Sequence, residues 1–203
     1  MQLPRLYPIV DARFFTTSKD LYVFCEELSA GGVTLLQYRN KSGDARLMLE
    51  HAVEIKRLVG SRVQLIMNDR ADLCLAAGFD GVHVGQDDLS AAAARRVIGP
   101  ELLLGVSTHN AEQLASADQT TADYLAIGPV FKTSSKENPD PTVGLEGVRR
   151  ARDITRKPIV GIGGITLENA ASVIAAGANS VAVISELVAE PRKRAEEFFR
   201  ILR

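Results

Sequence analysis

The chain repeats one structural unit eight times: a short apolar run, a polar or glycine-rich corner, and a segment with helical periodicity. The apolar runs are nearly continuous rather than alternating, which is typical of parallel strands buried on both faces. We expect strands at residues 6–10, 33–38, 63–67, 81–84, 102–106, 124–127, 158–162 and 180–184. Helices are expected at residues 20–30, 45–59, 71–77, 90–98, 111–117, 145–152, 167–176 and 192–202.

This repetition predicts a closed (β/α)8 TIM barrel that occupies residues 1–203 as a single domain. Eight units in 203 residues average about 25 residues each, which is short but sufficient for this fold. The alternative is an open doubly wound sheet. Residues 11–14, which read DARF after the first expected strand, are not the glycine-rich turn that cradles a pyrophosphate in such sheets. Eight regular units therefore favour closure.

Charge and hydropathy exclude two classes of partner. The net charge is −1, so there is no overall basic field to attract nucleic acid. No apolar window is long enough to span a membrane, and residues 1–10 do not resemble a signal peptide. Cys25 and Cys74 lie in apolar helical surroundings without metal-type spacing. We expect buried thiols in a reducing compartment, the cytoplasm.

Polar residues gather where the expected strands end, which is the functional rim of a parallel barrel. They occur at 37–41 (QYRNK), 68–70 (NDR), 85–88 (GQDD), 107–109 (STH), 128–143, 163–164 (GG) and 185 (S). The loops at the opposite end carry nothing comparable. The sequence thus predicts a site at the carboxyl end of the barrel.

The loop after the sixth expected strand combines two lysines with three consecutive hydroxyls, namely Lys132, Thr133, Ser134, Ser135 and Lys136. Ammonium and hydroxyl donors together suit phosphate oxygens. The alternative is a solvated loop whose lysines face water.

Gln37, Arg39 and Lys41 alternate along an extended segment, so they are expected to share one face. If that face points inward, it presents an amide, a guanidinium and an ammonium to an anion. The alternative is a solvated charged corner.

Asp69 and Asp88 end neighbouring strands. Two carboxylates brought together need a proton or a cation between them, and Mg²⁺ binds one or two carboxylates together with water and substrate phosphate. Asp69 is alternatively an N-cap of the next helix. Asp87 competes with Asp88 for the second position, and spacing does not decide between them.

Residues 161–165 read GIGGI after the seventh expected strand, and Ser185 begins a short helical piece after the eighth. Barrels frequently bind phosphate between these two loops through backbone N–H groups. The alternative is a tight strand–helix corner. Two anion sites on one rim fit one substrate with a monophosphate and another with a pyrophosphate leaving group.

The three histidines show no zinc spacing. We expect His83, inside a strand, to be a hydrogen-bonded structural residue, whereas His109 lies within reach of the site. No nucleophile–base pair is evident. Catalysis by positioning and electrostatics, assisted by a metal, is therefore expected without a catalytic side chain.

Together these motifs resemble the thiamine phosphate synthase family over nearly the whole chain. The most specific pieces are 37–41, 68–70, 81–88 (GVHVGQDD), 105–107 (GVS), 128–131 (GPVF) and 158–165 (PIVGIGGI). The resemblance implies that a hydroxymethylpyrimidine diphosphate ionises, loses pyrophosphate, and is attacked by the nitrogen of a thiazole phosphate to give thiamine phosphate.

The resemblance also implies roles for individual residues. It places the pyrimidine diphosphate at Gln37, Arg39, Lys41, Asn68, Ser107 and Lys136, and Mg²⁺ at Asp69 and Asp88. It places the thiazole phosphate at Thr133, Ser135, Gly164, Ile184 and Ser185. Ser135 stands where the family often has threonine, which keeps the hydroxyl.

Three other readings remain open. The sister family of thiazole tautomerases shares the barrel but needs no diphosphate site, so it would not require the two aspartates, Lys41 or Lys136. Phosphate-sugar isomerases and related synthases need an acid–base pair that is not evident here. A regulatory phosphate-binding barrel without catalytic activity is the third. The sequence leaves the oligomeric state open.

Overall fold

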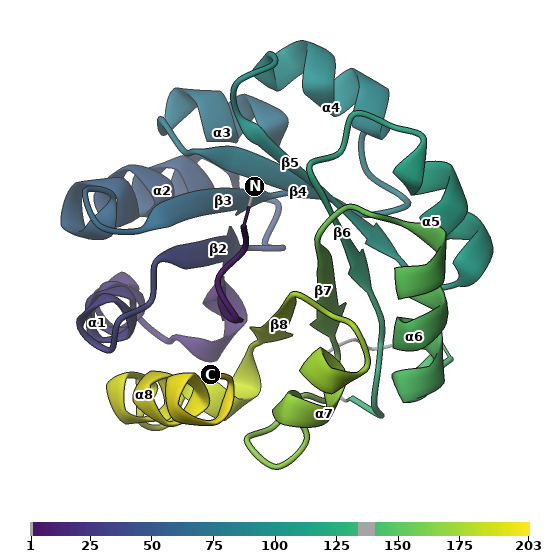
Figure 1. The fold of residues 1–203 in the computed structure, drawn as a ribbon. Coiled ribbons are helices and arrows are strands. Elements are labelled where there is room, and N and C mark those ends of the chain that lie inside the picture. The colour runs from purple at the N-terminus through teal and green to yellow at the C-terminus, as the bar shows by residue number, and fades with distance from the viewer. Residues whose placement is uncertain (1, 134–140) are drawn as a thin grey trace.

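The computed structural model describes residues 2–133 and 141–203, and it is a closed barrel of eight parallel strands in chain order (Figure 1). The strands are β1 Leu6–Asp11, β2 Leu35–Arg39, β3 Gln64–Asn68, β4 Gly81–Val84, β5 Leu103–Thr108, β6 Tyr124–Ile127, β7 Ile159–Ile162 and β8 Ser180–Val183. The barrel closes where β1 pairs with β8, with Leu6 opposite Val181. The predicted (β/α)8 fold is confirmed.

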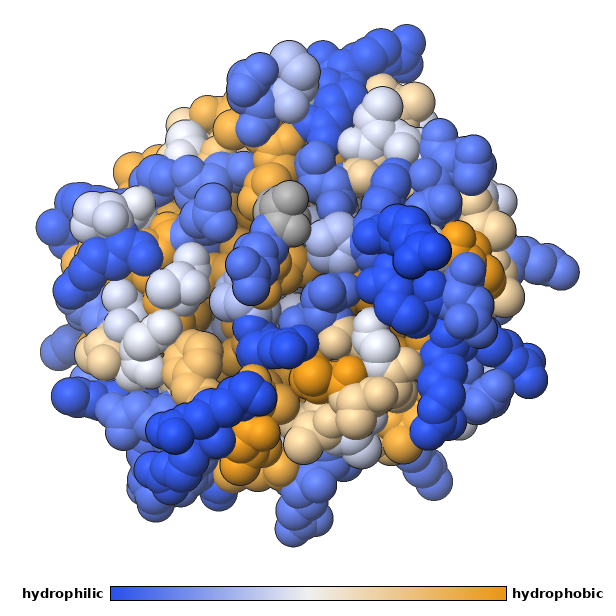
Figure 2. Space-filling model, viewed as in Figure 1, coloured by the Kyte–Doolittle hydropathy of each residue, from blue (hydrophilic) through white to orange (hydrophobic). Residues whose placement is uncertain are grey.

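A helix follows each strand and lies on the outside of the barrel (Figure 1). These helices are α1 Ser18–Ala30, α2 Ala45–Val59, α3 Ala71–Ala76, α4 Ala91–Ile98, α5 Ala111–Asp118, α6 Gly144–Ile154, α7 Ala170–Ala175 and α8 Pro191–Ile201. Two short 3₁₀ helices, η1 Ala12–Phe14 and η2 Ser185–Leu187, follow β1 and β8. Hydrophilic side chains dominate the outer edge of the face shown in Figure 2, as expected for helices that bury only one side.

The core has two parts. The larger part lies between the strands and the helices, and the smaller part fills the barrel interior. The interior part includes Leu3, Tyr7, Ile66 and Tyr124, all of which are buried. A barrel of eight strands is only wide enough to be filled by side chains, so any ligand must bind above this packed layer.

Most predicted boundaries agree with the structure to within two residues, and the largest difference concerns α7. The predicted helix 167–176 begins only at Ala170. The Asn169 side chain accepts from the Thr166 N–H and donates to the Gly164 carbonyl, both at 2.9 Å. These bonds stabilise a turn in place of the first helical residues.

Cys25 and Cys74 are buried and unpaired, as predicted. Across the described part of the chain, no helix combines the length and apolar character needed to cross a membrane.

Candidate active site

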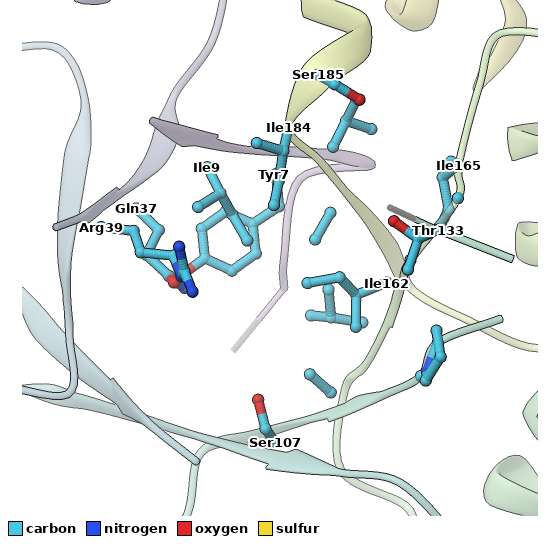
Figure 3. Close-up of a pocket in the computed structure, with 18 of the residues that line it drawn as sticks. Tyr7, Ile9, Gln37, Arg39, Ser107, Thr133, Ile162, Ile165, Ile184 and Ser185 are labelled. Atoms are coloured by element: carbon cyan, nitrogen blue, oxygen red, sulfur yellow. The ribbon is translucent and has the colours of Figure 1, made fainter. Parts of the chain in front are cut away.

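A pocket opens at the carboxyl ends of the strands (Figure 3). Gln37 and Arg39 lie on the left of it in this view, Thr133 lies on the right, and Ser185 lies at the top. Its lining residues include Tyr7, Ile9, Gln37, Arg39, Asn68, His83, Ser107, His109, Ala126, Thr133, Val160, Ile162, Gly163, Gly164, Ile184 and Ser185. The predicted residues from β2, β3 and β5 therefore face those from the loops after β6, β7 and β8.

Each cation of the β2 corner is paired with its own carboxylate. Arg39 lines the pocket and forms an ion pair with buried Asp11 at the end of β1. Lys41 lies beyond the strand end, is half exposed, and pairs with Asp69. Gln37 and Arg39 therefore line the pocket as expected of an inward face, whereas Lys41 is not among the lining residues.

Asp69 and Asp88 do come together, and their carboxyl groups lie within hydrogen-bond contact. Burial, together with the neighbouring Asp88, raises the pKa of Asp69 to about 6 against the opposing effect of Lys41. Asp88 Oδ2 also accepts a hydrogen bond from the Gly85 N–H at 2.8 Å. Two carboxylates so close need a proton or a cation between them. Asp88, and not exposed Asp87, is the partner of Asp69.

The backbone at Asp69 is in the left-handed region, with φ of 63°. Few residues other than glycine adopt this conformation, and such strain is concentrated at functional sites. Asp69 N–H donates to the His83 carbonyl at 2.8 Å, which anchors the strained residue to β4. The N-cap reading of Asp69 is wrong, because Arg70 occupies the N-cap position of α3.

Asn68 supplies a donor that the protein itself does not use. Its side chain is only 8% exposed, and its Nδ2 atom has no hydrogen-bond partner among the described residues. Asn68 ends β3 and lines the pocket. A buried donor without a partner is costly, so this N–H group is one that a ligand acceptor would satisfy.

His83 connects the pocket to the barrel interior. Its Nε2 lies 2.8 Å from Ser107 Oγ, and its Nδ1 lies 3.1 Å from the Tyr124 hydroxyl. Burial lowers the pKa of His83 to about 4, so the ring is neutral near pH 7. The prediction that His83 is a hydrogen-bonded structural residue is confirmed, although its partner Ser107 faces the pocket.

The opposite wall depends on close packing between the loops after β6 and β7. Gly164 has a φ of 63°, and a Cβ there would lie 2.5 Å from the Lys132 carbonyl oxygen. Only glycine fits such an approach. Ile184 and Ser185, at the start of η2, complete this wall. Thr133 lies among its lining residues, whereas Ser135 and Lys136 are outside the described residues.

His109 also lines the pocket. Its Nδ1 donates to the Gly128 carbonyl at 2.7 Å, and its backbone N–H donates to Gln113 Oε1 at 2.7 Å. These bonds fix the ring at the mouth, within reach of the site as expected.

Sequence reasoning missed three residues of this site. Asp11 was given no role, although it stands at a strand end as the other polar residues do. Tyr7 and Tyr124 are inward-facing residues of β1 and β6, and their hydroxyls lie 2.9 Å apart. Alternation along each strand was the signal that could have identified them, because every second residue faces the interior.

Comparison with known proteins gives one consistent result. A family model described as thiamine monophosphate synthase matches residues 6–187. The sequence is 61% identical to the thiamine-phosphate synthase of Koribacter versatilis over 100% of this chain and 97% of that protein. It is 45% identical to the thiamine-phosphate synthase of Chloroflexus aurantiacus over 91% of this chain and 85% of that protein.

Solved structures agree with this result. Thiamine phosphate pyrophosphorylase from Pyrococcus furiosus superposes with a TM-score of 0.86 at 33% identity, covering 98% of this chain and 95% of that one. A 3-hexulose-6-phosphate synthase superposes with a TM-score of 0.71 at 16% identity, covering 98% of this chain and 100% of that one. The second likeness is one of fold alone.

Proposed function

The chain belongs to the thiamine monophosphate synthase family. From this premise we propose which parts of its pocket bind each of the two substrates of that transferase. The observation that carries the proposal is that one pocket has two walls of different chemistry. One wall carries side-chain donors; the carboxylate pair Asp69 and Asp88 follows β3 and β4 at the same end of the barrel but is not among the lining residues. The other is made of glycine backbone and hydroxyl groups.

The first wall would bind the pyrimidine diphosphate. The Arg39 guanidinium suits a phosphate, the unpartnered amide of Asn68 suits an acceptor on the substrate, and Gln37 and Ser107 lie beside them. Lys41 and Lys136 belong to this set by resemblance. The apolar residues Ile9 and Val160 below the polar groups would pack against the pyrimidine ring and exclude water.

The second wall would bind the thiazole phosphate. Gly164, Ile184 and Ser185 bring two loops together where barrels frequently hold a phosphate. Glycine there lets backbone N–H groups approach an anion closely. Thr133 adds a hydroxyl, and Ser135 belongs to this set by resemblance. The thiazole nitrogen would then face the pyrimidine methylene carbon from the opposite wall.

Asp69 and Asp88 fit a magnesium ion. Their carboxyl groups are in contact, and two carboxylates this close are stabilised by a cation between them. When bound, Mg²⁺ would neutralise negative charge on the diphosphate and so make it a better leaving group. Lys41 would hold Asp69 in place through their ion pair.

The proposed reaction breaks the bond between the pyrimidine methylene carbon and the diphosphate oxygen, whose electron pair leaves with the pyrophosphate. The thiazole nitrogen supplies the electron pair of the new carbon–nitrogen bond. The protein's part is positioning and charge stabilisation, with no side chain acting as nucleophile. A thiazole tautomerase would need neither the diphosphate wall nor the carboxylate pair, so no observation favours that alternative.

The test compares two neighbouring aspartates. Asp88→Asn removes a carboxylate in contact with Asp69, whereas Asp87→Asn changes an exposed one. We expect Asp88→Asn to lower pyrophosphate release about a hundredfold and to raise the Mg²⁺ concentration needed, because ligand sets lose affinity when one member is changed. Asp87→Asn should stay within about twofold of wild type. Equal losses in both variants, or full activity of Asp88→Asn, would contradict the metal assignment.

A further inference from the structure

A chain of five hydrogen-bonded side chains crosses the barrel at the floor of the pocket. Gln37 Nε2 donates to the Tyr7 hydroxyl at 3.0 Å, and this hydroxyl lies 2.9 Å from that of Tyr124. The Tyr124 hydroxyl lies 3.1 Å from His83 Nδ1, and His83 Nε2 lies 2.8 Å from Ser107 Oγ. The three central residues are buried, and all five except Tyr124 are among the residues that line the pocket.

Only two arrangements give every link one donor and also use the protons of Tyr7, Tyr124 and His83 once each. Each tyrosine hydroxyl has one proton, and a neutral imidazole has one donor and one acceptor nitrogen. In the first direction, Gln37 donates to Tyr7, Tyr7 to Tyr124, and Tyr124 to His83 Nδ1. His83 then carries its proton on Nε2 and donates to Ser107. In the second, every bond is reversed, and the Gln37 carbonyl oxygen must face Tyr7.

The position of the Gln37 amide selects the first direction, because Nε2 faces the Tyr7 hydroxyl. The Tyr7 hydroxyl must then donate its hydrogen bond to Tyr124, since a buried donor without an acceptor is unfavourable. By the same argument, the Tyr124 hydroxyl donates to His83 Nδ1.

We propose that Tyr7, Tyr124 and His83 are positioning residues that make Ser107 a hydrogen-bond donor toward an acceptor atom of the bound pyrimidine diphosphate. Ser107 Oγ accepts from His83 Nε2–H, so its own proton is left to donate into the pocket. The identity of the ligand in this inference rests on the proposed function. The direction of the hydrogen bonds is independent of it.

The first experiment reads the direction without any measurement of activity. In a long-range ¹H–¹⁵N spectrum of the ¹⁵N-labelled protein near pH 7, assigned with His83→Gln, His83 should show a pyridine-type Nδ1 and a pyrrole-type Nε2. Tyr124→Phe should abolish this preference, because Nδ1 loses its donor. The opposite tautomer in the wild type would overturn the inference, even in a protein that makes thiamine phosphate.

The second experiment is a double-mutant cycle on the synthase reaction. Ser107→Ala and Tyr124→Phe should each lower kcat/KM for the pyrimidine diphosphate about tenfold, and the double variant should be no worse than Ser107→Ala alone. KM for the thiazole phosphate should stay unchanged. Multiplicative losses, or full activity of Tyr124→Phe, would overturn the relay. An inactive wild type would instead count against the proposed function.

A matched control tests whether the loss of any buried tyrosine–histidine hydrogen bond has the same effect as the loss of the one beside Ser107. The Tyr38 hydroxyl lies 2.9 Å from His51 Nδ1 and is buried, but neither residue lines the pocket. Tyr38→Phe therefore removes the same kind of bond elsewhere in the barrel. Its kcat/KM should stay within about twofold of wild type. If Tyr38→Phe and Tyr124→Phe lower kcat/KM equally, the effect is structural and the relay is wrong.

Discussion

Asp11 decides where the Arg39 guanidinium lies. The Asp11 side chain is only 2% exposed, and it forms an ion pair with Arg39 at the neighbouring strand end. It also accepts from the Arg13 N–H at 3.2 Å, which fixes the start of η1. A buried carboxylate is retained only when paired, so Asp11 and Arg39 hold each other in place at the pocket wall.

Asp11→Asn should therefore weaken the binding of the pyrimidine diphosphate. The amide keeps the shape of the side chain but loses the charge that orients Arg39. We expect KM for this substrate to rise about tenfold, equivalent to about 1.4 kcal/mol. Steady-state kinetics checks it.

The control for Asp11→Asn is Arg13→Gln, because Arg13 pairs with the same carboxylate from a more exposed position, with Nε 3.4 Å from Oδ2. Exposed ion pairs contribute little, so its KM should remain close to wild type. A larger effect of Arg13→Gln than of Asp11→Asn would show that Asp11 does not act through Arg39.

Buried histidines should make the protein less stable in mild acid. Burial lowers the pKa of His51 below its ordinary 6.5, and that of His83 to about 4. As pH falls from 6.5 toward 4, these histidines bind protons in the unfolded chain before the folded one, so their contribution to the free energy of unfolding decreases, whereas Asp69 with its raised pKa acts in the opposite direction. Urea titrations of wild type and His51→Gln at pH 7 and pH 5 check this. The stability difference between them should shrink at pH 5, and a constant difference would contradict it.

At the scale of elements, the amino-terminal end of the barrel carries a repeated stabilising contact. Asp80, just before β4, accepts from the Leu65 N–H in β3, and Asp123, just before β6, accepts from the Leu104 N–H in β5, both at 2.8 Å. Asn179, before β8, accepts from Ile159 in β7 at 2.9 Å. Each contact joins two adjacent strands at the end away from the pocket.

Each acceptor also has a cationic partner from a helix, which makes these contacts stronger than a neutral hydrogen bond. Lys56, Arg95 and Arg152 pair respectively with Asp80, Asp123 and Asn179. These polar residues at the amino-terminal end serve the fold, as expected for the stability face of a barrel. The prediction that the loops at this end carry no comparable polar residues is therefore wrong.

Asp123→Ala should destabilise the protein without changing its kinetics. The substitution leaves the Leu104 N–H without its acceptor and removes the charged partner of Arg95, which keeps only backbone carbonyls, at a cost of about 2 kcal/mol. In a chain of 203 residues this corresponds to a fall in Tm of about 4–8 °C. Thermal unfolding checks the stability, and kcat/KM at 25 °C checks the site. A selective loss of activity would show that the amino-terminal end is coupled to the pocket.

Periodicity predicted the elements well because it depends on neighbours in sequence. The bounds of β4 and β6 were predicted without error. The start of α7 was not, because the Asn169 side chain bonds locally to the backbone and delays the helix. The strand-end rule predicted that Asp69 and Asp88 would meet. It could not predict the Tyr7–Tyr124 contact, which joins residues 117 positions apart across the interior.

At the scale of the whole molecule, barrel closure is what assembles the pocket. The residues of the first wall lie at the carboxyl ends of β2, β3 and β5, and those of the second lie in the loops after β6, β7 and β8. The pairing of β1 with β8 brings the two ends of the chain together around one mouth. The two walls are nevertheless built from different loops, so their ligands should be separable by mutation.

Thermal shifts with two probes test this separation. Pyrophosphate with Mg²⁺ should occupy the first wall, and a thiazole phosphate the second. A ligand at about 100 times its Kd stabilises by about 2.7 kcal/mol, which raises Tm by roughly 5–11 °C in a chain of this size. Asp88→Asn should lose only the shift from Mg²⁺ and pyrophosphate, and Ser185→Ala only that from the thiazole phosphate. If both variants lost the same shift, the two walls would form one anion site, and a two-substrate transferase would have no place for its second substrate.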